Sequence, residues 1–118
     1  MKIGMLLTEI HRNESALVRE LLELADRHRA IHEVHHVARD LARWSVGHVE
    51  QLAEVAPAHG EELSAHAPAD VSASAPASSS MDMLSDLRSV YMNAAGISVQ
   101  WVMLGQAAQA LQLDDVLS

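Results

Sequence analysis

The segment "LARWSVGHVEQL", residues 41–52, decides the fold class that we predict. Its apolar residues recur at spacings of three and four, as an α-helix with one apolar face requires. The stripe that contains this segment consists of Val34, Val37, Leu41, Trp44, His48, Leu52 and Val55. Pro57 and Gly60 follow the stripe, and both residue types are typical of a helix end. We therefore expect a helix over residues 31–56, with His48 in the middle of its apolar face.

A second helix of the same kind is predicted upstream, over residues 3–29. Its stripe also contains one acidic residue, Glu14, and consists otherwise of Leu7, Ile10, Leu17, Leu21, Leu24 and His28. The residues between the two stripes include no Gly or Pro, so one long helix is an alternative. We favour a tight turn near residues 29–31, which would place the two helices antiparallel as a helical hairpin.

The remainder of the chain predicts a linker and one more long helix. Residues 57–81 hold all three prolines and many Ala and Ser residues without apolar periodicity, as a linker or crossover does. A third helix is expected over residues 82–112. Its stripe is Met83, Leu87, Val90, Ala94, Ile97, Trp101, Leu104, Ala108 and Leu111. The prediction is an all-α, antiparallel helical bundle of three long helices in a single domain, residues 1–118.

Composition excludes several classes of function. The 118 residues are 49% hydrophobic and include no Phe and no Cys, so one aliphatic core is expected, without thiolate chemistry. A formal charge of −8 opposes binding to the phosphates of nucleic acid. No signal peptide or membrane span is recognised, and we expect a soluble cytoplasmic protein that binds neither nucleic acid nor membranes.

Four histidines stand close together in "DRHRAIHEVHH", residues 26–36. On a helix His35 would point away from the apolar stripe, and Glu33 and His36 would form a Glu-x-x-His pair near the helix end. We interpret the cluster as a solvated charged patch rather than a ligand set. His28 lies on an apolar face near the turn, where a capping role is as good an explanation. His28, Glu33 and His36 are thus the weaker candidates for a metal site.

Glu14 and His48 are the stronger pair, because each interrupts the apolar stripe of its own helix. Folding the chain near residue 30 brings the two positions level, so we expect contact between them and a largely buried His48. Either a Glu–His hydrogen bond compensates for burial, or the two side chains are ligands of Fe, Mn or Zn. The third helix offers no central acid to complete such a site, since Asn93 and Gln100 are poor replacements.

Two segments carry a resemblance to a known family. "DLARWSVGHVEQLAEVA", residues 40–56, and "LRSVYMNAAGISVQWVMLGQAAQA", residues 87–110, resemble the small bacterial ferritin-like proteins of unknown function. The resemblance implies an up-down helical bundle, in some members with a di-iron centre made from Glu and Glu-x-x-His. Of that centre only Glu14 and His48 have matching character. In such relatives a fourth helix follows, so we expect oligomerisation to complete the bundle.

The expected function is that of a ferritin-like structural or protein-interaction module without a complete di-metal centre. The alternative is a metal-binding protein in which Glu14 and His48 hold iron or another divalent metal. Enzymatic activity is not expected unless that alternative applies, in which case the chain would be a metal-dependent ferritin-like oxidase. The expected partner is a second copy, in a homodimer formed through Tyr91, Trp101 and Leu104 of the third helix.

Overall fold

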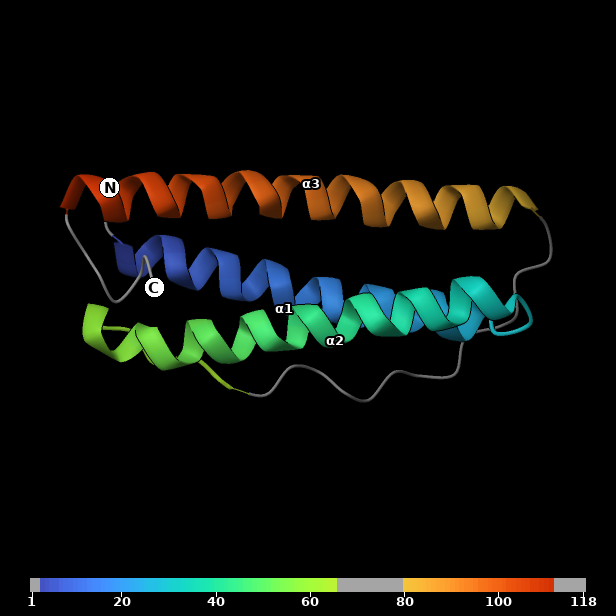
Figure 1. The fold of residues 1–118 in the computed structure, drawn as a ribbon, viewed down its shortest axis with the longest axis horizontal. Helices are drawn as coiled ribbons and strands as arrows, with labels where there is room; N and C mark the ends of the chain where they lie inside the picture. The colour runs from blue at the N-terminus through green and yellow to red at the C-terminus, as the bar shows by residue number, and fades with distance from the viewer. Residues whose placement is uncertain (1–2, 66–79, 112–118) are drawn as a thin grey trace.

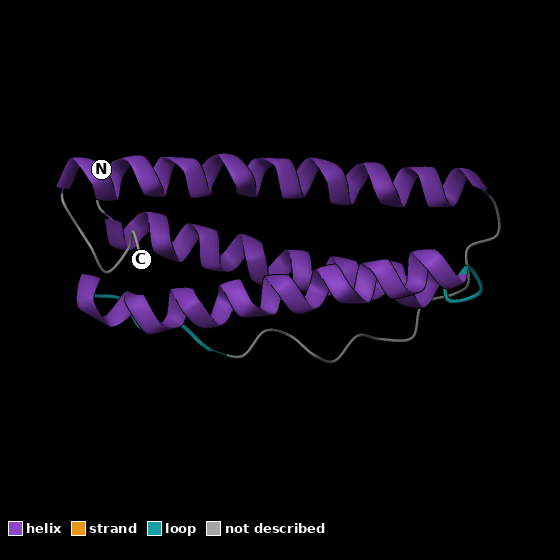
Figure 2. Cartoon of the chain, viewed as in Figure 1, coloured by secondary structure: helices purple, strands orange, loops and turns teal. Residues whose placement is uncertain are grey.

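The computed structural model describes residues 3–65 and 80–111, and the fold over these ranges is all-helical, as predicted. The long helices lie side by side along the bundle (Figures 1 and 2). The helices are α1 (Ile3–Arg27), α2 (His32–Val55), the 3-10 helix η1 (Ala56–His59) and α3 (Ser80–Leu111). No helix in this part of the chain combines the length and apolar character needed to cross a bilayer.

The helix ends lie within two residues of the predicted ones, with two differences in the expected linker. The first residues of the expected linker belong to η1. Gly60 ends this helix and has the left-handed conformation, with φ of 80°. The last two residues of the expected linker belong to α3, which begins at Ser80. The linker's residues 66–79 lie outside the described ranges.

The turn between α1 and α2 is tight, so the alternative of one continuous helix is wrong. The N–H of Ile31 donates a hydrogen bond to the carbonyl oxygen of His28 at 2.9 Å, and α2 begins at the next residue. The ring of His35 bonds back to the carbonyl oxygen of Ala25 at 2.7 Å. These bonds hold the start of α2 against the end of α1.

Helix α1 lies between the other two. Both α2 and α3 pack against it (Figure 1), and both run in the direction opposite to α1. Helices α2 and α3 are therefore parallel to each other. Parallel helices cannot be joined by a short turn. The first residues after η1, up to Ser64, run back alongside α1 from Gly4 to His11. There the His11 ring bonds to the carbonyl oxygen of Ser64 at 2.7 Å.

The face of α2 that meets α1 differs from the predicted stripe. The buried positions are Ala38, Ala42, Ser45, Val49 and Leu52. Of the predicted stripe, Val37, Leu41 and Trp44 are exposed, and Trp44 retains 73% of its accessible surface. Both sets have helical spacing, but the small side chains of the first allow the two helix backbones to approach closely. The larger apolar side chains are consequently turned toward the open side of α2.

Three polar pairs join α1 to α3 at intervals of seven residues, and we call them the polar ladder. The first member of each pair donates the bond: Asn13 to Gln100 at 2.9 Å, Asn93 to Glu20 at 2.5 Å, and Arg27 to Asp86 at 3.0 Å. Each step of seven along α1 is matched by a step of seven back along α3, so the ladder specifies one antiparallel register. From the sequence, Asn93 and Gln100 were considered only as replacements for a metal-binding acid, and this role was not predicted.

Two glycines in helices are predicted to respond oppositely to alanine. A Cβ at Gly4 would lie 2.7 Å from the carbonyl oxygen of His59, whereas one at Gly96 would meet nothing within 4 Å. Gly4→Ala should cost at least about 1 kcal/mol through overpacking. Gly96→Ala should raise the unfolding free energy by about 1 kcal/mol through helix propensity. Urea unfolding at one protein concentration measures both, and equal shifts in one direction would contradict the packing at Gly4.

Candidate functional site

Glu14 and His48 meet where α1 crosses the middle of α2. Glu14 is a buried residue of α1 with 2% of its surface exposed. The Nδ1 atom of His48 lies 2.5 Å from its Oε2 atom, so the predicted contact between the two residues is confirmed. The predicted burial of His48 is wrong, because its side chain is 45% exposed. The reason is the rotation of α2, which turns Ser45 and Val49 toward α1 and leaves His48 at the edge of the interface.

Burial of Glu14 favours the protonated form of its carboxyl group. Loss of water around Glu14 raises the pKa of its carboxyl group above the ordinary value of 4.5, and the charge and hydrogen bond of His48 act in the opposite direction. While Glu14 is ionised it can only accept a hydrogen bond, so Nδ1 of His48 carries the proton. In the neutral ring of that tautomer, Nε2 carries no proton and can accept a hydrogen bond or bind a metal ion. A buried carboxylate that orients an imidazole in this way is a known support for acid–base and metal-ligating histidines.

Helix α3 contributes an aromatic neighbour to this pair. The ring of Trp101 lies 5.4 Å from the ring of His48. Trp101 also packs against the apolar clusters around Ile10 and Ile97, and its buried Nε1 atom has no hydrogen-bond partner among the described residues. No acidic side chain of α3 approaches Glu14 among the contacts described above.

The donor set does not fit a complete metal centre within one chain. Glu14 and His48 supply one carboxylate and one imidazole, and structural or catalytic sites for Zn or Fe use three or more protein ligands. Among residues 3–65 and 80–111, no three His, Asp or Glu side chains are grouped so that they could hold an ion. A metal at this pair would need further ligands from outside the described chain.

The weaker candidates for a metal site lie near the α1–α2 turn, at one end of the bundle and apart from Glu14 and His48. His28 is buried, and its Nε2 atom lies 2.8 Å from Oδ2 of Asp86. The second oxygen of Asp86 accepts the bond from Arg27. Glu33 and His36 are exposed near the start of α2. Asp86 is the participant that the sequence interpretation missed, and the regular spacing of Asp86, Asn93 and Gln100 at seven-residue intervals was the available signal.

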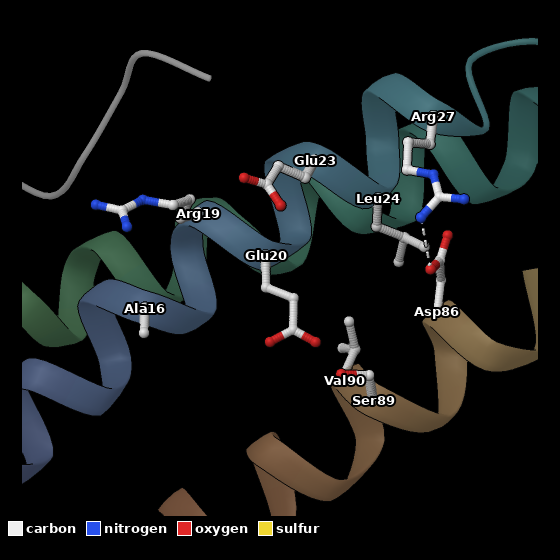
Figure 3. A pocket seen from close by; sticks show the side chains of 9 residues that line it. All are labelled: Ala16, Arg19, Glu20, Glu23, Leu24, Arg27, Asp86, Ser89 and Val90. Carbon is white, nitrogen blue, oxygen red and sulfur yellow. Dashed lines mark hydrogen bonds and ion pairs between the residues drawn. The ribbon is translucent and has the colours of Figure 1, made fainter. Parts of the chain in front are cut away.

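Two pockets lie between α1 and α3. The larger has a volume of about 430 Å³, and Figure 3 shows Glu20 and Asp86 on facing sides of it. It is lined by Ala16, Arg19, Glu20, Glu23, Leu24, Arg27, Asp86, Ser89 and Val90. A second, of about 300 Å³, is lined by Asn13, Ala16, Leu17, Met92, Asn93, Gly96, Ile97 and Gln100. Neither pocket is lined by Glu14 or His48, so a small molecule bound in either pocket would not contact the pair.

The three predicted interface residues have different surroundings. Tyr91 is 74% exposed on α3. Trp101 is partly buried between the helices, and Leu104 is buried in the chain's own core beside Leu7 and Leu52. Only Tyr91 of the three is therefore a largely open surface residue.

Comparison with known proteins places no relative beside this chain: no family model, no curated protein and no solved structure matches it.

Proposed function

We propose that this chain is a ferritin-like helical bundle that works as a structural and protein-interaction module through self-association. Two observations support a ferritin-like arrangement. Helices α1 and α2 form an antiparallel hairpin, and α3 runs parallel to α2 (Figure 1). A single long crossover between parallel helices is the connection that ferritin-like bundles use.

The observation that carries the interaction role is the exposed apolar surface of α2 and α3. Val37, Leu41 and Trp44 are exposed on α2. Their counterparts on α3 are Leu84, Leu87, Tyr91, Met92, Val99, Val102, Met103 and Leu111. Apolar surface of this extent on a folded domain usually marks a site of association.

The distribution of charge along the chain supports a second copy of it as the partner bound at this apolar surface. The sequence from Ser89 to Leu111 contains no Asp, Glu, Lys or Arg, although the chain carries a formal charge of −8. Two acidic copies can therefore meet through this part of α3 without burying like charges. A twofold axis lets the same surface serve both partners, which is the commonest form of self-association.

The test is the mass of the particle in solution. Light scattering at micromolar concentration should give about twice the chain mass of 12.8 kDa. Trp44→Asp and Tyr91→Asp each place a charge in the proposed interface and should produce a helical species with the mass of one chain. Met5→Asp is the matched control, since Met5 is equally exposed on α1, and it should leave the dimer intact.

Wild-type protein with the mass of one chain would overturn the self-association. Loss of the dimer in Met5→Asp as readily as in Trp44→Asp would show that added charge, not position, causes dissociation.

A second candidate function is the binding of iron or another divalent metal at Glu14 and His48. The 2.5 Å contact lets the buried carboxylate of Glu14 orient the half-exposed ring of His48, whose Nε2 atom can bind the ion. One chain supplies too few ligands, so this candidate needs further ligands from a second copy. Elemental analysis of protein purified without a tag or chelator tests it. A stoichiometric metal that His48→Ala removes would support it, and metal-free dimer would refute it.

A further inference from the structure

The first turn of α2 carries a pattern that neither the core nor the proposed interface uses. Residues 32–36 read His-Glu-Val-His-His, which includes the pattern His-Glu-x-x-His. In a helix its two outer histidines lie four residues apart and on one face, the spacing with which helical zinc sites present two imidazoles. His32 and His36 are both exposed at this end of the bundle.

The ring geometry agrees with that spacing. The ring centroids of His32 and His36 are 4.2 Å apart, with 70° between the ring planes. The third histidine, His35, has its ring 5.4 Å from that of His36. Two imidazoles this close, both reachable from solvent, can turn a nitrogen each toward one ion without a change in the backbone.

The backbone under the pair is held in place. A carbonyl oxygen only accepts hydrogen bonds, so the 2.7 Å contact between His35 and Ala25 requires a proton on Nδ1 of His35. Together with the bond from Ile31 to His28, it anchors the first turn of α2 to the end of α1. The two outer histidines are thus presented by a supported helical turn, which lowers the ordering cost of binding.

We propose that His32 and His36 form a binding site for a borderline divalent transition metal, Zn²⁺ or Cu²⁺, with water in the remaining positions. Imidazole nitrogen is a preferred ligand of these ions, whereas Ca²⁺ and Mg²⁺ require oxygen. Glu33 places a carboxylate in the same helical turn, which favours the ion electrostatically. Among the described residues, no three His, Asp or Glu side chains are placed so that they could hold one ion together, so the site has two protein ligands and is not a peptidase centre.

The site differs from the Glu14–His48 pair in residues, position and solvent exposure, and it does not depend on self-association. Protons and metal ions compete for an imidazole nitrogen, so Zn²⁺ should bind more weakly at pH 5 than at pH 7.5. Binding that stays equally tight at pH 5 would argue against imidazole ligands.

Isothermal titration of the untagged, metal-free full chain with Zn²⁺ at pH 7.5 tests the proposal. We expect one ion per chain, and a loss of affinity of at least about tenfold in both His32→Ala and His36→Ala. His11→Ala is the matched control, because His11 of α1 bonds to Ser64 and belongs to neither candidate metal site, and it should keep the wild-type affinity. Because both outer histidines are exposed, their variants should retain the wild-type circular dichroism.

Electron paramagnetic resonance of the Cu²⁺-loaded chain gives an independent readout, with hyperfine splitting from two nitrogens expected in the wild type and from one in either variant. The proposal is overturned if Zn²⁺ does not bind, if His32→Ala and His36→Ala bind it as tightly as the wild type, or if His48→Ala abolishes binding. The last result would assign the metal to the Glu14 pair instead.

Discussion

Asp86→Ala is expected to lower the free energy of unfolding by about 2–4 kcal/mol, because one substitution removes the partner of two side chains. Asp86 joins the first turns of α3 to His28, which is almost completely buried, and to Arg27, which is partly exposed. Without the carboxylate, the ring nitrogen of His28 remains buried without its bond. Water can reach Arg27, so the cost falls below the range for a fully buried ion pair.

Urea unfolding followed by circular dichroism measures this loss. Asp86→Asn is the conservative variant, since an amide oxygen and an amide nitrogen occupy the same two positions, and it should retain part of the stability. Glu50→Ala, which removes an exposed acidic side chain of α2, is the control. If Asp86→Ala and Glu50→Ala have the same small effect, the contact with His28 does not stabilise the fold.

His48→Ala is the second substitution with a large expected effect, a loss of about 1–3 kcal/mol at pH 7. It leaves the carboxylate of Glu14 buried without the hydrogen bond and the charge that His48 provides. The expected loss of stability is smaller than for a fully buried pair, because the side chain of His48 is nearly half exposed and water can replace it beside Glu14 in the variant.

The pH dependence follows from the direction of the Glu14 pKa. Its carboxyl group binds a proton more tightly in the folded than in the unfolded chain, because burial raises the pKa above 4.5. Its stability contribution is therefore complete below that unfolded pKa and is lost as the pH rises through the folded pKa. Removal of His48 takes away the influences that lower the pKa, so the window of loss extends to higher pH. The cost of His48→Ala should be smaller at pH 4.5 than at pH 7.

The replacement of both partners by leucine provides the control. Glu14→Leu combined with His48→Leu removes the buried carboxylate with its donor, and it should be closer to wild-type stability at pH 7 than His48→Ala alone. A cost of His48→Ala that is the same at pH 4.5 and pH 7 would show that lost packing beside Trp101, and not the unpaired carboxylate, is responsible.

Local pattern was sufficient to predict the helices and one of the long-range contacts. The α1–α2 turn limits how the two helices can pair, so the contact between Glu14 and His48 followed from counting residues back from the turn. The exposure of His48 did not follow. Two stripes on α2 have the same helical spacing. The predicted stripe contains the larger apolar residues, whereas the smaller residues Ala38, Ala42 and Ser45 face α1.

The sequence alone determined the all-α class, the position of three long helices and the pairing of the first two, because helix periodicity and a short turn act between residues close in the chain. Only the tertiary structure decided which face of α2 is buried and which residues join α3 to α1. The Asp86 contacts and the polar ladder connect residues 58 to 87 positions apart. Their register depends on how two helix surfaces fit together, which the spacing within each helix does not specify.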